Sequence, residues 1–351
     1  MTTSDFPAWQ GQFSRQVRCL RSNLGSTLHQ LECLFGPWIA RWRLAQQEEG
    51  AHSRERRWPL RLVFWTFLWQ VAQAGTACRE AIRQAQALCL NNGRALPPDQ
   101  KSPYCQARGR LPLERLEEIH QALVKEAQQA IAQKDLWCGH SVLVVDGTTV
   151  TAPDTPANQK AYPQQKVQKP GCGFPIIRIV ALLSLATGML ASWTTGCWTQ
   201  SELTLFQTLW EHLLPGQVLL ADRGFCSWGL LAQCLERQVH AVFRVRGARR
   251  RDFRQGKRLS RDERLVQWTK PAKRPATIGQ REWARLPAVL TLRLVRCRLD
   301  HPGFRTRQVI LVTTLLESEC YSPAALGQLY YRRWRMELTL RSLKTTLQME
   351  H

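Results

Sequence analysis

Residues 142–149 read VLVVDGTT and mark an abrupt change in the composition of the chain. Four consecutive apolar, mostly β-branched residues are typical of a buried strand, and this strand is expected to end at Asp146. Residues 217–224 read QVLLADRG, a second pattern of the same kind that ends at Asp222. Each aspartate alone is most simply a turn residue after a strand. Together they predict two carboxylates at matching strand ends.

The residues around these two segments predict an α/β fold with a mixed sheet. Further strands are expected at residues 176–185, 189–194 and 241–245, and helices at residues 201–213 and 227–236. Ligands of open α/β sheets bind at the carboxyl ends of the strands. If the first and fourth strands are parallel neighbours, Asp146 and Asp222 lie side by side. Adjacent carboxylates repel each other unless a cation separates them, and oxygen ligands select Mg²⁺ or Mn²⁺.

A third carboxylate lies on a predicted helix near the end of the chain. Residues 330–344 read YYRRWRMELTLRSLK and contain no Gly or Pro. At about 100° per residue, Glu337 shares one stripe with Tyr330, Arg333 and Lys344, beside a second, apolar stripe that would face a core. The simplest explanation is ion pairing between Glu337 and arginines one turn away. The two aspartates upstream favour a third metal ligand instead.

The remaining segments predict a helical N-terminal domain at residues 1–140 and a basic insertion at residues 246–310. Residues 244–307 contain 20 Lys and Arg against 5 Asp and Glu, with β-rich segments at 289–299 and 308–315. A clamp on a DNA backbone is the favoured use of such a charge excess. Trp268 and Trp283 would most simply pack in a small core, and stacking on an unpaired base is the alternative.

The overall charge favours a polyanionic partner. The chain of 351 residues carries 49 Lys and Arg against 27 Asp and Glu, a net charge of +22, and nucleic acid is the usual partner of such a protein. No apolar run approaches the length of a membrane-spanning helix, and residues 1–6 lack the features of a secretory signal. The 12 cysteines lack the spacing of a zinc site, so reduced thiols in the cytoplasm are expected.

These motifs resemble those of the DDE transposases of bacterial insertion sequences, of the insertion-sequence-four type. Residues 145–149 and 221–225 resemble the first-Asp and second-Asp motifs of that family, and residues 173–188 resemble the hairpin between them. Residues 104–108, which read YCQAR, also look like the family. The family's Tyr-Arg-Glu-Lys signature is reproduced at its spacing by four residues: Tyr330, Arg333, Glu337 and Lys344.

The resemblance implies a ribonuclease H-like catalytic domain at residues 141–351, interrupted by the insertion, and an N-terminal domain that binds DNA ends. Asp146, Asp222 and Glu337 would hold two Mg²⁺ or Mn²⁺ ions for DNA cleavage and strand transfer in cut-and-paste transposition. The expected DNA contacts are Tyr330, Arg333, Lys344 and Arg223. The partners would be double-stranded DNA, both terminal repeats and target, and a second copy in a synaptic dimer, at the nucleoid of a bacterial cytoplasm.

Two alternatives to an active transposase remain open. Relatives generally continue past the signature with further helices, whereas this sequence ends at His351, so the resemblance also predicts a chain shortened at its C-terminus. Such a chain could be a DNA-binding remnant without catalysis, which metal-independent, salt-sensitive binding would identify. It could also be another ribonuclease H-like nuclease, such as a resolvase, which would prefer branched junctions.

Overall fold

The computed structural model describes residues 27–39, 44, 57–73, 75–169, 171–247, 255–299 and 308–346, without the side chains of residues 34, 335, 339, 340 and 342–346. Two compact units divide near Ala130, and the second comprises Ile131–Ser342. Within the described residues, every helix is too short or too polar to cross a lipid bilayer.

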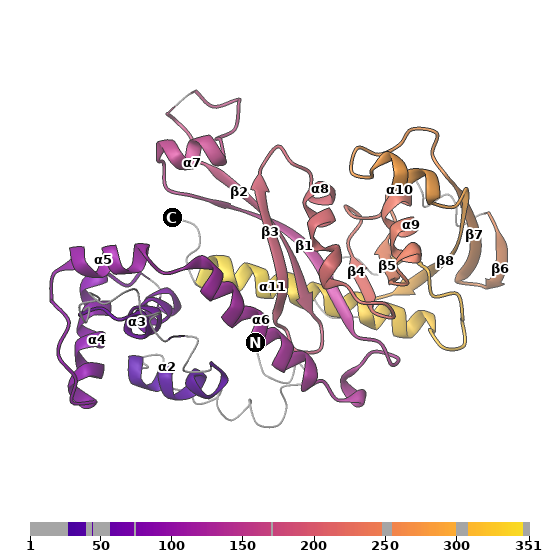
Figure 1. The fold of residues 1–351 in the computed structure, drawn as a ribbon. Helices are drawn as coiled ribbons and strands as arrows, with labels where there is room; N and C mark the ends of the chain where they lie inside the picture. Colours follow the sequence, from indigo (N-terminus) through magenta and orange to yellow (C-terminus); the bar gives the residue numbers. More distant parts are fainter. Residues whose placement is uncertain are drawn as a thin grey trace. The chain divides into compact units, whose positions relative to one another are not determined.

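The first unit is made of helices packed around aromatic side chains (Figure 1). Its elements are α2 (Leu28–Phe35), η3 (Gly36–Trp38), α3 (Leu60–Ala72), α4 (Cys78–Asn91), α5 (Lys101–Gly109) and α6 (Leu113–Gln129). Trp65 and Tyr104 are fully buried at its centre. The Tyr104 hydroxyl donates to Gln70 Oε1 at 2.7 Å, and Arg108 Nη1 donates to the same oxygen at 3.3 Å. Residues 104–108 therefore fasten α5 to α3.

The second unit is built on a nine-stranded sheet in the order β3-β2-β1-β4-β5-β9-β8-β7-β6 (Figure 1). β4 pairs in parallel with β1 and β5, and the other neighbouring strands pair antiparallel. The strands are β1 (Val142–Thr151), β2 (Ile176–Ser184), β3 (Leu190–Cys197), β4 (Val218–Ala221), β5 (His240–Arg244), β6 (Lys257–Ser260), β7 (Glu263–Thr269), β8 (Val289–Arg298) and β9 (Gln308–Thr313). The fold is therefore α/β, with a large, mostly antiparallel sheet.

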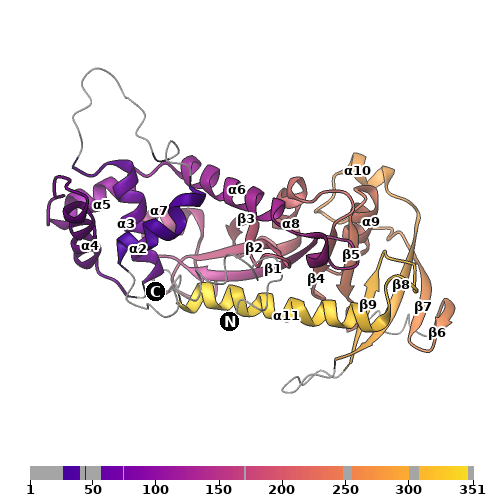
Figure 2. The same cartoon turned by 90° about the horizontal axis from the view of Figure 1, so that it is seen from below.

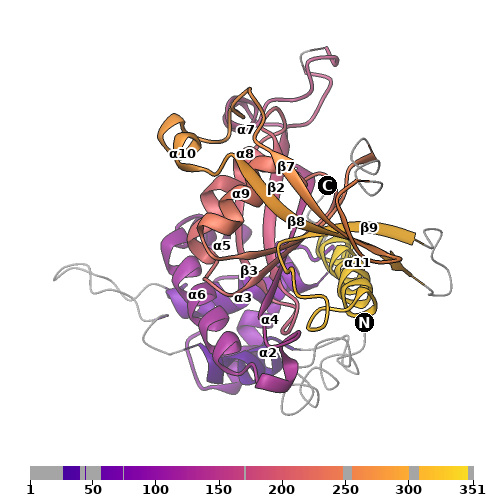
Figure 3. The same ribbon diagram turned by 90° about the vertical axis from the view of Figure 1, so that its right-hand side faces the viewer.

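Helices cover both faces of this sheet. The helical elements of the second unit are η5 (Gln133–Asp135), α7 (Pro156–Ala161), α8 (Glu202–Phe206), η6 (Gln207–His212), α9 (Trp228–Glu236), α10 (Gln280–Arg285) and α11 (Pro323–Thr346). Figures 2 and 3 show α11 running along the face opposite α8 and α9. Ser201 and Ser227 cap α8 and α9 by accepting hydrogen bonds from backbone N–H groups of the first turn. The strands and helices expected between residues 142 and 245 are confirmed, although residues 207–212 continue α8 as a 3-10 helix.

The strand that carries Asp146 does not end there, contrary to the expectation from sequence. β1 continues to Thr151 because β2 pairs with it from Leu143 to Thr151. On its other edge, the pairing with β4 stops at Val144 and Leu220. Asp146 therefore lies within a strand but beyond the end of the parallel neighbour.

The insertion expected at residues 246–310 does not form a separate small core. β9 pairs with β5, so the β9-β8-β7-β6 strands extend the same sheet. Val266, Trp268 and Leu292 belong to the same buried cluster as Leu143 and Phe206. The two strands expected in the insertion are confirmed, whereas β6, β7 and α10 were not anticipated because their alternating charged residues obscure the apolar pattern. Trp268 is buried and Trp283 packs against that cluster, which agrees with the structural role favoured for both.

Candidate active site

Asp146 and Asp222 occupy equivalent positions on neighbouring parallel strands. Val144 is paired with Leu220, and each aspartate follows two residues later. Because side chains alternate between the faces of a strand, both aspartates share the face of Val144 and Leu220. Leu143 and Leu219 point the other way, into the cluster formed with α8 and α9. The two carboxylates therefore lie on the α11 side of the sheet.

Backbone amides hold both aspartates. Asp146 Oδ1 accepts a hydrogen bond from the Gly147 N–H at 3.0 Å, and Asp222 Oδ1 accepts one from the Gly224 N–H at 2.6 Å. The second bond closes the tight turn directly after β4. The Arg246 side chain also holds this turn, since Nε donates to the Arg223 carbonyl at 3.0 Å and Nη2 to the Gly224 carbonyl at 2.7 Å.

Helix α11 brings Glu337 and Arg333 to the same site. Burial raises the pKa of Asp146 from 3.8 to about 6, Arg333 opposes this shift, and the negative charges of Glu337 and Asp222 add to it. Each of these groups must lie near Asp146 to affect its pKa. Glu337, Asp222 and Arg333 therefore lie within electrostatic range of Asp146.

Arg333 is the buried cation of this cluster. Its side chain is 5% exposed, and Nη2 donates to Glu337 Oε1 at 2.5 Å. The guanidinium lies 5.2 Å from the centroid of the Tyr330 ring. Among the residues that the structure describes, no hydrogen-bond partner is found for its buried Nε and Nη1. Buried donors without partners are costly, so two positions at this site are available to an acceptor that is not part of the chain.

The helix stripe that carries Tyr330, Arg333 and Glu337 is buried in its first half. Tyr330 and Arg333 are buried beside Leu326, Leu329 and Met336. The simple explanation considered for Glu337, an ion pair one helical turn away, is present in the structure. It coexists with the approach of Glu337 to Asp146, so the two interpretations are not exclusive.

The donors of the site suit a hard divalent cation, but they are not gathered as a complete set of ligands. Asp146, Asp222 and Glu337 offer only carboxylate oxygens, which Mg²⁺ and Mn²⁺ prefer. Among the residues that the structure describes, no three His, Cys, Asp or Glu side chains are grouped so that they could hold a metal ion. Glu337 is instead paired with Arg333, so a shared metal requires Glu337 to exchange that partner.

The other expected DNA contacts differ in their surroundings. Arg223 is exposed directly after Asp222. The Tyr330 hydroxyl is buried and has no hydrogen-bond partner within the described part of the chain, which is unusual for a phenol. Lys344 lies in α11, but its side chain is outside the described residues.

Glu202, the first residue of α8, is a fourth carboxylate near the site that the sequence did not reveal. Burial raises its pKa, Arg178 opposes the shift, and Asp222 adds to it. A glutamate in the first turn of a capped helix is explained by the cap and the helix dipole alone, so its sequence carries no functional signal. The nearby role of Arg246 was also missed, because Arg246 stands within a run of arginines.

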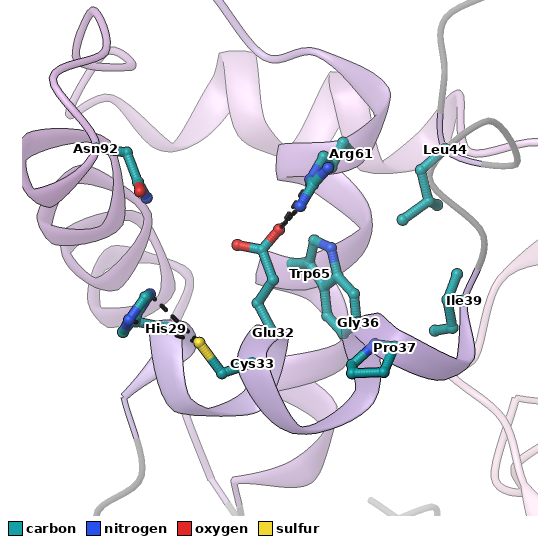
Figure 4. Close-up of a pocket in the computed structure, with 10 residues that line it drawn as sticks. All are labelled: His29, Glu32, Cys33, Gly36, Pro37, Ile39, Leu44, Arg61, Trp65 and Asn92. Atoms are coloured by element: carbon teal, nitrogen blue, oxygen red, sulfur yellow. Dashed lines mark hydrogen bonds and ion pairs between the residues drawn. The ribbon is translucent and has the colours of Figure 1, made fainter.

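The first unit holds a pocket of its own, with a volume of about 420 Å³ (Figure 4). Arg61 Nε donates to Glu32 Oε1 at 2.8 Å on its wall, and Cys33 lies 3.5 Å from a ring nitrogen of His29. The cysteines described, among them Cys33, are free thiols. None of the three carboxylates discussed above lines this pocket.

Comparison with known proteins agrees with the geometry of the second unit. Residues 137–351 match the family described as "Transposase DDE domain". The chain is 25% identical over 296 residues to the transposase InsG for insertion sequence element IS4 of Escherichia coli K-12, covering 84% of this chain and 64% of InsG. It is also 25% identical over 185 residues to InsZ of the same strain, whose transposase name is provisional, covering 52% of this chain and 60% of InsZ. The chain thus spans less than two thirds of the length of these relatives. The match over most of the chain shows that it belongs to the family of transposases with a DDE domain.

Proposed function

We propose that this chain catalyses metal-dependent DNA cleavage and strand transfer at the ends of an insertion sequence. The observation that carries the proposal is the placement of Asp146 and Asp222 at equivalent positions of parallel neighbouring strands, with Glu337 close enough to raise the pKa of Asp146. Membership of the DDE family supports the same activity. The InsG name, which assigns that relative to an insertion sequence, supports a DNA substrate of this class.

Asp146, Asp222 and Glu337 would hold Mg²⁺ or Mn²⁺, two ions per site. When bound, two such ions supply charge that stabilises the attacking and leaving oxygens of a phosphoryl transfer. The residues of the chain contribute position and charge. The Gly147 and Gly224 amides orient the aspartates. Arg246 holds the short turn after β4 and would thereby keep Asp222 at the position equivalent to that of Asp146.

The cationic residues would bind the DNA backbone beside the carboxylates. Arg333 offers two buried N–H groups that lack a partner, a match for the oxygens of a phosphate. Arg333 Nη2 donates to Glu337, and it would serve the same purpose if Glu337 held a metal ion instead. Tyr330, Lys344 and the exposed Arg223 would contact the phosphates on either side.

The remaining parts of the proposal concern domains and partners. The β3-β2-β1-β4-β5 half of the sheet would be the ribonuclease H-like core, and the β9-β8-β7-β6 half a basic extension along the DNA. Residues 1–140 would bind the terminal repeats. The active form would be a dimer that holds two transposon ends and then the target DNA, at the bacterial nucleoid.

A non-catalytic DNA-binding remnant is the second candidate, because the Arg333–Glu337 pair neutralises Glu337 without any metal. A cleavage assay separates the two. The substrate is a labelled duplex carrying candidate terminal repeats of the insertion sequence, with Mn²⁺ or Mg²⁺. The transposase nicks at the repeat ends, and Asp146→Asn, Asp222→Asn and Glu337→Gln each abolish nicking, whereas Glu211→Gln, an exposed carboxylate on η6, does not. Salt-sensitive binding without nicking by the unaltered chain would establish the remnant instead.

A further inference from the structure

Glu202 approaches the active site from the face of the sheet opposite α11. It begins α8, whose first turn is fixed by the Ser201 hydroxyl accepting from the Thr204 N–H at 3.1 Å. Leu205 and Phe206 of the same helix are buried, and α8 packs against β2 and β3, so α8 is anchored on that face. The position of Glu202 is therefore set by packing and capping, and not by an ion pair.

Gly147 provides the space that the Glu202 carboxylate occupies. A Cβ atom on Gly147 would lie 2.3 Å from Glu202 Oε1 and 2.4 Å from Cδ, far inside van der Waals contact. The backbone of Gly147 is not in the left-handed region, so its conformation does not require glycine. The absence of a side chain matters here because a carboxylate lies over the residue that follows Asp146.

Charged side chains on neighbouring elements affect the pKa of Glu202. Asp222 is near enough to raise the pKa of Glu202, and Arg178 on β2 is near enough to lower it. Arg178 donates through Nη1 to the Gln200 carbonyl. No ion pair between Arg178 and Glu202 is formed within the described residues. Glu202 therefore lies half-buried near Asp222 without a paired cation, although a buried carboxylate normally needs one.

A separate observation concerns the α11 side of this cluster. Arg333 is almost fully buried on the α11 side, is coupled to Asp146, and keeps two donors unpaired. Buried donors without a partner are costly, and a phosphate oxygen bound at this cluster would satisfy them. The Arg333 donors therefore favour a ligand from outside the chain over internal ion pairing alone.

We infer that Glu202 is a fourth carboxylate of the active site and that it holds a divalent cation together with Asp222, from the α8 side of the sheet. The inference rests on the proposed function, because it assigns a further ligand to the same metal site. It gives Gly147 a role as well: its missing side chain leaves room for the carboxylate that completes the site.

The test measures the affinity of the full chain for Mn²⁺ by calorimetric titration without DNA. The same titration is repeated for each variant. Glu202→Gln is expected to weaken Mn²⁺ binding by about tenfold or more, the loss typical when a group that supports a metal is removed. Gly147→Ala is expected to weaken it in the same direction, since the methyl group displaces the carboxylate. In a Glu202→Ala background, Gly147→Ala should change nothing further. Glu211→Gln on η6 is the matched control and should bind like the unaltered chain.

The outcomes separate this inference from the proposed function. Asp146→Asn is titrated in parallel, and unaltered Mn²⁺ binding by that variant would overturn the proposed metal site itself. If Asp146→Asn loses Mn²⁺ while Glu202→Gln binds normally, the site stands and the role of Glu202 is refuted. A purely structural role is recognised by a lowered unfolding temperature of Glu202→Gln with unchanged Mn²⁺ affinity, which also refutes the inference. DNA binding in the presence of EDTA should be equal for all variants.

Discussion

Two buried glutamate–arginine pairs in the second unit differ in how completely their atoms are satisfied. In the β7–β8 pair, Glu263 accepts from Arg293 Nε at 3.0 Å and also from two serine hydroxyls. Arg293 is fully buried and further donates to backbone carbonyls after β9, those of Leu315, Glu317 and Tyr321. In the α11 pair, Arg333 keeps two donors unpaired and Glu337 is 31% exposed. We call the Glu263–Arg293 pair closed, because its charged groups are hydrogen-bonded within the protein. We call the Glu337–Arg333 pair open, because two donors of Arg333 are not.

The pKa values of neighbouring carboxyls follow the same division. Burial alone would raise the pKa of Glu263, yet its hydrogen bonds from Ser318, Ser260 and Arg293 lower it overall. At the open pair, burial and like charges raise the pKa of Asp146 to about 6 in spite of Arg333. In a closed pair, hydrogen bonds within the protein stabilise the charged groups. In an open pair, the unpaired groups are stabilised only when a ligand binds to them. The comparison indicates which pair holds the fold and which serves the site.

Removal of the closed pair's cation should have the largest effect on stability. Arg293→Met is expected to lower the free energy of unfolding by about 3–5 kcal/mol, because Glu263 is left buried and uncompensated. Arg296 lies on the same strand as Arg293 and makes a half-exposed contact with Asp262 at 3.5 Å. Arg296→Met should lower the free energy of unfolding by about 1 kcal/mol or less. Denaturant unfolding measures both. Equal losses for the two variants would show that the closed pair is not special.

Arg333→Met tests the open pair and should affect catalysis more than stability. Cleavage is expected to fall by about 10²–10³-fold, as when a buried donor to transition-state charge is removed, with a smaller stability loss than in Arg293→Met. Affinity for Mn²⁺ without DNA should not decrease, because Glu337 is freed from its partner. Arg341→Met, farther along α11 and exposed, is the control. A variant that unfolds like Arg293→Met while cleaving normally would reverse the assignment of the two pairs.

The raised pKa of Asp146 predicts a pH dependence of stability for the metal-free chain. A carboxyl whose pKa is higher in the folded than in the unfolded state binds more protons when folded, so stability increases as the pH falls through about 6. Between pH 7 and pH 5, this group should contribute about 1 kcal/mol. The difference between the unaltered chain and Asp146→Asn isolates it. A difference that does not vary with pH would contradict the burial of Asp146 as an ionisable group.

Arg246 should give the smallest of these effects. Its two hydrogen bonds to the turn after β4 are exposed, so Arg246→Ala is expected to cost about 0.5–1.5 kcal/mol. The Arg246→Ala variant should also bind Mn²⁺ a fewfold more weakly without DNA, because Asp222 is less well positioned. Arg258→Ala on β6 removes a similar exposed charge and should leave Mn²⁺ binding unchanged. If both variants weaken only DNA binding, Arg246 is a phosphate contact and not a support for Asp222.

Much of the site-bearing half of the sheet could be predicted from sequence. The runs before Asp146 and Asp222 are short, apolar and bounded by turn residues, so local composition is enough to identify them as buried strands. The Tyr330–Glu337 pattern identified a helix and its candidate residues. The extension by β7 and β6 was not anticipated, because strands such as residues 263–269 owe their pairing to a neighbouring strand more than to their own residues.

Sequence alone determined which residues can supply the chemistry, namely two strand-borne aspartates, a helix-borne glutamate and an excess of arginines. The tertiary structure decided which of these charges are closed and which are open. Arg293 and Arg333 cannot be told apart by residue type, because their difference depends on backbone carbonyls and hydroxyls brought in from distant segments. The same holds for Glu202, which reaches the site only because α8 packs on β2 and β3 and Gly147 leaves room for it. Burial and hydrogen-bond partners are properties of the folded chain, and they set the energy of a charge.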